Sequence, residues 1–349
     1  MAAHVLHKNH PLRIFAFSSI LTIALGVIVG LYGGAVDIWL YAILVLLEVT
    51  FSFDNAVINS KILARMSRVW QTIFLTVGII IAVFIVRFSL PVALVMVATN
   101  IEFNEVVTMA LNDPDQYSIA LHEAAPVINA FGGSFLLMLG ISYFIDRKKD
   151  IHWLGLIEKR LAMAGKYENF KALAMLSLAL ILYATVGPEQ RIVVLVAALI
   201  GITLHMLLEV MGAFFAHHQS NAHALTGLAA FMSFLYLEVL DSSFSLDGVI
   251  GAFAITSDVL LIIAGLGVGA FWVRSLTVFL VRNKTLDHYR YLEHGAHWAI
   301  LALGMVMVLK LYHIEPPEWI IGSLGLIFIS TAVVSSILER RRIHHQAIA

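Results

Sequence analysis

The stretch LLEVTFSFDNAV, residues 46–57, holds two carboxylates, Glu48 and Asp54, inside an otherwise apolar run. The surrounding residues, about 37–60, are long enough and apolar enough to cross a membrane as a helix. An acid near the centre of a bilayer costs about 2.5–3.5 kcal/mol even on a lenient insertion scale. We therefore expect this pair of acids to serve a function within the membrane.

The composition of the whole chain indicates an integral membrane protein. Of its 349 residues, 60% are apolar and 13% are charged, and its mean hydropathy is +0.90, whereas soluble globular proteins average about 25% charged residues. The formal net charge of −1 offers no basic face, so we expect no nucleic-acid partner. The absence of cysteine excludes disulfides, thiolate zinc sites and iron–sulfur clusters.

Ten apolar segments of the length that crosses about 30 Å of hydrocarbon can be counted along the chain. Clusters of Lys and Arg follow the second, fourth, eighth and tenth segments, and because basic short loops stay in the cytoplasm, we expect both termini there. The opposite side receives the expected loop 98–126, which has five acids and no Lys or Arg. The sequence thus predicts an all-α protein of about ten transmembrane helices in the bacterial inner (plasma) membrane. The expected spans are residues 12–33, 37–60, 70–97, 127–145, 170–187, 191–215, 224–250, 258–281, 295–313 and 319–338.

An internal repeat relates the two halves of the chain. LLEVTFSFDNAV aligns without gaps on VLDSSFSLDGVI, residues 239–250, which pairs Glu48 with Asp241 and Asp54 with Asp247. In each half a glycine then precedes an intramembrane arginine by nine residues. These glycine and arginine pairs are Gly78 with Arg87 and Gly265 with Arg274.

The repeat predicts two membrane halves of opposite orientation. The first is residues 1–187, with a cytoplasmic connection at 146–170, and the second is residues 188–349 with a cytoplasmic tail. Five spans in each half is an odd number, so the halves have inverted topology. This is a recurrent plan of secondary transporters, in which the binding site lies near the midplane between the repeats.

The helical geometry of each motif leaves two arrangements open. A straight helix turns Asp54 about 120° away from the face that carries Glu48. We expect the helices to be unwound near Ser52–Asn55 and Ser245–Gly248, which would gather carboxylates and free backbone carbonyls. In the alternative, regular helices place Asp54 and its repeat equivalent against neighbouring helices as gating or proton-carrying groups.

Acids outnumber bases within the expected spans. Arg87 and Arg274 can each neutralise one acid as a counter-ion or gate group, and the remaining carboxylates must be protonated, lie in water or bind cations. The six acids in question are Glu48, Asp54, Glu209, Glu238, Asp241 and Asp247.

Oxygen ligands without cysteine suit a hard divalent cation such as magnesium, calcium or manganese. Glu238 and Glu209 are possible additional ligands. His205 shares a helical face with Glu209 and could add an imidazole that favours manganese, although a histidine hydrogen-bonded within the bundle is the plainer interpretation.

Other motifs predict no further chemistry. The histidines at 217, 218 and 223 are interpreted as part of a solvated cytoplasmic loop. Gly265, Gly267 and Gly269 indicate close helix packing. No nucleophile falls together with a base and an orienting group, so we expect neither an enzyme nor a tightly bound cofactor. The expected partners are the metal ion and the lipid bilayer; the sequence does not predict an oligomeric state.

EVTFSFDNA and DSSFSLDGVIGAF, with the arginine-bearing span after each, resemble the TerC family of membrane proteins, which is named for tellurium resistance and related to the LysE-type exporters. The resemblance covers residues 36–313 and implies export of a metal cation, with manganese as the leading substrate. The second motif has glycine where the first has asparagine. The resemblance places the ion at Glu48, Asp54, Asn55, Asp241 and Asp247.

Two other classes of function stay open at this point. A proton-linked exporter of a small organic solute would use some of the acids as proton carriers. A membrane component of a metal or tellurite stress-response complex would bind partners and transport nothing.

Overall fold

The computed structural model describes residues 10–99, 101–146, 149, 151–167, 169–217, 224–253, 255–256 and 258–348. Over these residues the chain is helical, and the extended pairing found there is an isolated bridge between Met66 and Leu225. The chain divides into two compact units, residues 1–122 with 222–286 and residues 123–221 with 287–349. Each unit takes segments from both expected halves, so the compact units do not coincide with the halves of the repeat.

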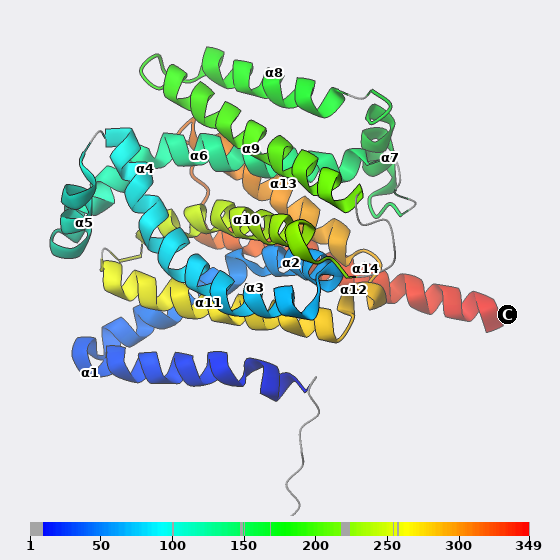
Figure 1. The fold of residues 1–349 in the computed structure, drawn as a ribbon, viewed down its shortest axis with the longest axis horizontal. Coiled ribbons are helices and arrows are strands. Elements are labelled where there is room, and N and C mark those ends of the chain that lie inside the picture. The colour runs from blue at the N-terminus through cyan, green and yellow to red at the C-terminus, as the bar shows by residue number, and fades with distance from the viewer. Residues whose placement is uncertain are drawn as a thin grey trace, which may run out of the picture. The chain divides into compact units, whose positions relative to one another are not determined.

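The first unit gathers the helices that carry the two acidic motifs. Gly34, at φ 82° and ψ −163°, divides α1 into two arms, a conformation that glycine adopts readily. The arms lie back to back as a hairpin (Figure 1), and Tyr41 Oη donates to the Thr22 carbonyl across it at 3.2 Å. The elements of this unit are α1 (Pro11–Phe51), α2 (Phe53–Arg65), α3 (Arg68–Ile80), the π-helix η1 (Ile81–Ser89), α4 (Leu90–Thr99), α5 (Phe103–Asn112), α10 (Gly227–Phe253) and α11 (Val259–Arg282).

Helix α11 packs closely on the second arm of α1, as its glycines predict. A Cβ atom at Gly265 would collide with the Leu44 side chain, and one at Gly269 would collide with the Glu48 side chain and lie 3.1 Å from the Val45 carbonyl. Glycine at these positions lets two helix backbones approach. The small residues of α11 therefore set the depth at which Glu48 is buried.

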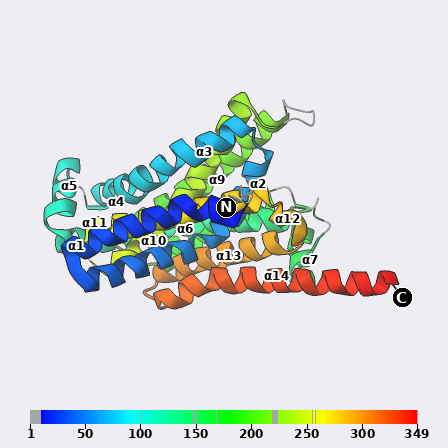
Figure 2. The ribbon, with the colours of Figure 1, turned by 90° about the horizontal axis from the view of Figure 1, so that it is seen from below.

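The second unit contains the remaining long helices. Its core includes Met138, Leu182 and Ala198, each with at most 1% of its surface exposed. Figure 2 shows α13 and α14 lying along each other, and a side chain at Gly295 would lie 2.7 Å from the Phe328 carbonyl. Its helices are α6 (Pro114–Ile145, which begins in the first unit), α7 (Gly155–Ala164), α8 (Phe170–Thr185), α9 (Arg191–His217), α13 (Leu292–Lys310) and α14 (Glu318–Ile348). The short α12 (Thr285–His288) precedes α13 and crosses the boundary between the units.

The helices are those of a membrane protein. Each of the ten expected spans lies on one or more of them. Six described helical segments are long and apolar enough to cross a bilayer on length and composition alone. They are Pro11–Phe51, Pro114–Ile145, Arg191–Met211, Val259–Arg282, Leu292–Lys310 and Ser323–Arg342.

The structure corrects the expectation of an outer loop at 98–126, because most of this segment is helical. It contains α5 and the first residues of α6. Pro114 occupies the first position of α6, and the Asp113 carboxylate accepts a hydrogen bond from the Gln116 N–H at 3.3 Å. Proline followed by a free turn of N–H groups is a helix-start signal that a search for apolar spans does not register.

Candidate functional site

The two acidic motifs differ in backbone structure, and neither is unwound as expected. Helix α1 ends at Phe51 and α2 begins at Phe53, with only Ser52 between them at φ −100° and ψ 13°. Hydrogen bonds continue across this break, from Ser52 N to the Glu48 carbonyl at 2.9 Å and from Ala56 N to the Ser52 carbonyl at 3.1 Å. Helix α10 runs unbroken through Ser245–Gly248. The predicted unwinding is therefore wrong for the second motif and reduced to one residue in the first.

The two motif helices meet in a reciprocal, antiparallel contact. Asn55 Nδ2 donates to Asp241 Oδ1. A Cβ built at Gly248 would lie 3.6 Å from Glu48 Oε2. In the sequence alignment Asn55 pairs with Gly248 and Glu48 with Asp241, so the first contact is the repeat equivalent of the second. Residues early in one motif thus face residues late in the other.

The Arg274 guanidinium lies beside this contact and forms ion pairs with two carboxylates. Arg274 Nη2 lies 3.2 Å from Glu238 Oε1 and 3.5 Å from Asp241 Oδ2. The Arg274 side chain also donates from Nη1 to the Phe74 carbonyl at 3.1 Å, and its guanidinium carbon lies 3.6 Å from the centre of the Phe74 ring. Arg274 thus forms ion pairs with two of the six acids of the expected spans.

Several polar side chains around the contact are buried with an oxygen that has no hydrogen-bond partner. Glu48 and Asp54 are 1% and 3% exposed, and Ser52 Oγ donates to Glu48 Oε1 at 2.7 Å. Asp54 lies in the first turn of α2, where the helix dipole favours an acid. Among the described residues, the unpartnered buried oxygens of this unit are Asp54 Oδ1, Asn55 Oδ1, Asn59 Oδ1, Glu238 Oε2 and Ser245 Oγ.

Carboxylate, amide and hydroxyl oxygens are the type of ligand that hard cations bind, although the described side chains do not by themselves close a metal cage. No group of three or more His, Asp and Glu side chains in the described part of the chain lies close enough to hold a metal ion. The side chains of Asp247 and Arg87 fall outside the described ones, while their backbones lie in α10 and η1. The search therefore does not include the second aspartate of the repeat.

The other candidate ligands lie on α9, in the second unit. Glu209 forms an ion pair with Lys171, with Nζ 2.5 Å from Oε1, and its side chain is 43% exposed. His205 is 2% exposed, packs edge-on against Phe135 at 5.5 Å, and its Nδ1 has no partner among the described residues. Of the histidine cluster, positions 218 and 223 and the side chain of His217 lie outside the described residues.

Sequence reasoning missed a buried carboxylate network in the second unit. Glu158 of α7 is 1% exposed and lies 2.9 Å from His294 Nδ1 and 3.0 Å from Trp298 Nε1 of α13. It also accepts from the backbone N–H groups of Trp153 at 2.9 Å and Leu154 at 3.2 Å. The nearby motif HGAHW has no metalloprotease spacing, and the 136 residues between Glu158 and His294 hide their contact from any local pattern.

This network fixes the charge of Glu158. Burial acts to raise the pKa of the carboxylate, but the hydrogen bonds from His294 and Trp298, the charge of His294 and the Leu154 N–H together lower it to about 2. Since an ionised carboxylate can only accept, His294 Nδ1 is the donor in their bond. Glu158 thus ties the connecting helix α7 to α13.

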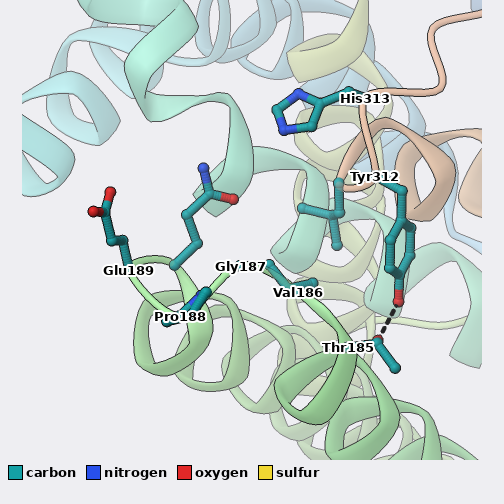
Figure 3. Close-up of a pocket in the computed structure, with 9 residues that line it drawn as sticks. Thr185, Val186, Gly187, Pro188, Glu189, Tyr312 and His313 are labelled. Atoms are coloured by element: carbon teal, nitrogen blue, oxygen red, sulfur yellow. Dashed lines mark hydrogen bonds between the residues drawn. The ribbon is translucent and has the colours of Figure 1, made fainter.

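A separate hollow of about 510 Å³ lies at one end of the second unit (Figure 3). It is formed by the turns that follow α8 and α13. The Thr185 and Tyr312 hydroxyls meet at 2.7 Å on its wall, while His313 and Glu189 point from opposite turns (Figure 3). Its lining is of mixed polarity and has no gathered charge, so it carries no chemistry of its own.

A comparison with protein families gives one match. The family model described as "Protein of unknown function (DUF475)" matches residues 53–343. No curated protein and no solved structure matches the chain.

Proposed function

The chain belongs to the DUF475 family of proteins of unknown function, and we propose that it is a membrane transporter that exports a divalent metal cation, with manganese as the leading substrate. Transport proceeds by alternating access around the contact between the two acidic motifs. The protein is not an enzyme in this proposal, and it has no resident cofactor besides the ion in transit.

The observation that carries the proposal is the buried Asp54 Oδ1, which has no hydrogen-bond partner among the described residues and lies next in sequence to Asn55 of this contact. Four described acids of the first unit are buried, and the buried base described beside them is Arg274; the acids are Glu48, Asp54, Glu238 and Asp241. Unpaired buried carboxylates are strongly unfavourable, and in membrane helices such acids mark ion pathways. The unpartnered oxygens of Asp54 and Asn55 are available to a cation.

The reciprocal contact supports the finer topology. Two inverted repeats would cross as antiparallel copies, and the contacts of Asn55 with Asp241 and of Gly248 with Glu48 follow this rule. We accordingly keep ten spans, both termini cytoplasmic and a bacterial plasma-membrane location as parts of the proposal.

The metal ligands in the proposal are Glu48, Asp54, Asn55, Asp241 and Asp247, as the resemblance to TerC proteins implies. Carboxylate and amide oxygens favour hard divalent ions over copper(I) or mercury. Glu238 lies against Arg274 and is a lesser candidate. Glu209 is paired with Lys171, which leaves it little reason to bind the ion.

A proton-linked exporter of an organic solute is the second candidate. It is favoured by the unpartnered buried oxygens of Asp54 and Glu238, because a proton needs only one carboxylate. In this alternative Asp54 or Glu238 carries the proton. A non-transporting membrane component of a metal or tellurite stress-response complex is the third candidate, and it requires no ion flux.

Flux measurements with purified protein test the proposal. Liposomes that contain the protein should release Mn²⁺ faster than empty liposomes, and calorimetry at neutral pH should show Mn²⁺ binding. Proton movement without divalent binding would select the proton-linked exporter. Protein that is folded and yet moves neither ion would leave only the non-transporting component.

A further inference from the structure

Arg274 is held in place more firmly than a counter-ion requires. Its guanidinium lies over the Phe74 ring at 3.6 Å and donates to the Phe74 carbonyl at 3.1 Å. Gly78 lies directly beneath it, where a Cβ would come within 3.3 Å of both terminal nitrogens and would collide with Glu238. Cation–π contact and a backbone acceptor thus fix the guanidinium independently of the carboxylates.

The two carboxylates at this guanidinium are not equivalent. Glu238 is the nearer partner, at 3.2 Å, and Asp241 the farther one, at 3.5 Å, and both meet the same nitrogen Nη2. Asp241 is held in addition by the Asn55 amide. Asp241 can therefore move away from the guanidinium while Glu238 stays paired with it. Arg274 would then still have an acidic partner.

We propose that Arg274 is a tethered cation that replaces the transported metal ion at Asp241 when the site is empty. The inference rests on the proposed function, since it needs a carrier that returns without its ion. An empty site with several ionised acids and no cation would be costly to carry through the low-dielectric part of the membrane. Arg274 lowers that cost when the metal is absent, and Asp241 turns from the guanidinium to the metal when the metal binds, while Glu238 stays paired with Arg274.

This role separates two transport modes that a purely structural arginine would not separate. In metal-for-metal exchange the carrier crosses loaded in both directions, so the tethered cation is not needed. In net efflux the carrier must return empty, and the arginine is needed on every cycle. Loss of the positive charge should slow net efflux while exchange persists.

The experiment compares Arg274→Gln with the wild type in liposomes, using Mn²⁺ as the probe. We expect net efflux to fall at least tenfold, Mn²⁺ exchange to stay within about threefold, and Mn²⁺ binding to tighten about tenfold because a competing cation is gone. Arg274→Lys keeps the charge and should restore much of the net efflux. Equal loss of both modes in folded protein, or unchanged net efflux, would overturn the inference.

A second variant covers the case in which Arg274→Gln does not fold. Glu238→Gln removes the nearer acid and leaves Asp241 as the acid paired with the guanidinium, so Mn²⁺ binding should weaken about tenfold while the ratio of net efflux to exchange does not fall. Tighter binding in this variant contradicts the inference.

If wild-type protein moves no Mn²⁺ in either mode, the proposed function fails, and the inference about Arg274 fails with it. If the wild type moves Mn²⁺ in both modes and the variants do not separate them, the inference about Arg274 alone fails.

Discussion

Asp54 in the first unit and Glu158 in the second are both buried carboxylates, yet their surroundings differ. Glu158 receives hydrogen bonds from His294, Trp298 and two backbone N–H groups. Asp54 is 3% exposed, and its Oδ1 has no hydrogen-bond partner among the described residues. A buried acid whose oxygens are satisfied by the protein stabilises the fold, whereas one left unsatisfied has capacity for a ligand.

The largest effect we expect is the loss of transport in Asp54→Asn. The change removes one charge from the shared site, so Mn²⁺ efflux at equal protein abundance should fall at least 100-fold. The fold should persist, because an amide costs less than a carboxylate inside a membrane. Asp247→Asn should behave in the same way if the repeat is functional, and Glu48→Gln and Asp241→Asn should lose part of the activity.

The matched control is Glu123→Gln, because Glu123 is an exposed acid of α6. Its carboxylate is already solvated, so efflux should stay within about twofold of the wild type. Wild-type efflux in Asp54→Asn would remove the contrast between a ligand acid and a structural acid.

The opposite phenotype is expected of Glu158→Ala. The substitution leaves His294 and Trp298 without their buried acceptor, and breaking a buried charge pair typically costs about 3–5 kcal/mol of stability. Thermal unfolding in detergent should therefore occur at a clearly lower temperature, while efflux per folded molecule is kept.

Glu339→Ala is the comparison variant for this change. Glu339 pairs with Arg290 at 3.0 Å, but the two side chains are 29% and 48% exposed. Such a pair contributes about 1 kcal/mol or less. Equal destabilisation by both substitutions would show that the Glu158 network has no special weight.

The sequence could predict the features of this structure that depend on local patterns of residues. Runs of apolar residues place the helices, and the glycines of α11 predict close helix packing, which the structure confirms. That the partner is the helix segment with Glu48 is known only from the structure. The acids at 48 and 54 are visible as exceptions to hydropathy.

The parts that sequence did not predict depend on distant contacts or on small energy differences. Glu158 and His294 are 136 residues apart, and no periodicity links them. The unwinding expected at Ser245–Gly248 fails because an unbroken α10 keeps its backbone hydrogen bonds, which nothing in a membrane interior would otherwise replace. Polar residues in a motif therefore do not by themselves predict a broken helix.

The pH dependence of stability gives a further test of the structural role of Glu158, in contrast to Asp54. The pKa of Glu158 is lowered from an ordinary 4.5 to about 2. A group whose pKa is lower in the folded state contributes stability above its unfolded pKa, and this contribution is lost as the pH falls from about 4.5 toward 2. The shift corresponds to about 3 kcal/mol at neutral pH.

Denaturant unfolding at pH 6 and pH 3 checks this expectation in the wild type and in Glu158→Gln. The difference between the two proteins should shrink at the lower pH, because the wild-type carboxylate is then mostly protonated in the unfolded state but still mostly ionised in the folded state. Parallel pH profiles would mean that Glu158 contributes through hydrogen bonds alone and that its charge does not matter.

The smallest effect is expected at Glu209, which tests whether an acid on an apolar helix must be a ligand. Its ion pair with Lys171 is short, 2.5 Å, but the side chains are 43% and 26% exposed, so solvent screens much of the attraction. Glu209→Gln should keep Mn²⁺ efflux within about twofold and cost about 1 kcal/mol or less of stability. Lys171→Gln should give the same small loss, and the double substitution should add little, since either single change already breaks the pair. The three variants are compared by their Mn²⁺ efflux and by their thermal stability in calorimetry. A tenfold loss of efflux in Glu209→Gln but not in Lys171→Gln would instead give Glu209 a role on the ion's path, and satisfied partners would no longer separate structural acids from functional ones.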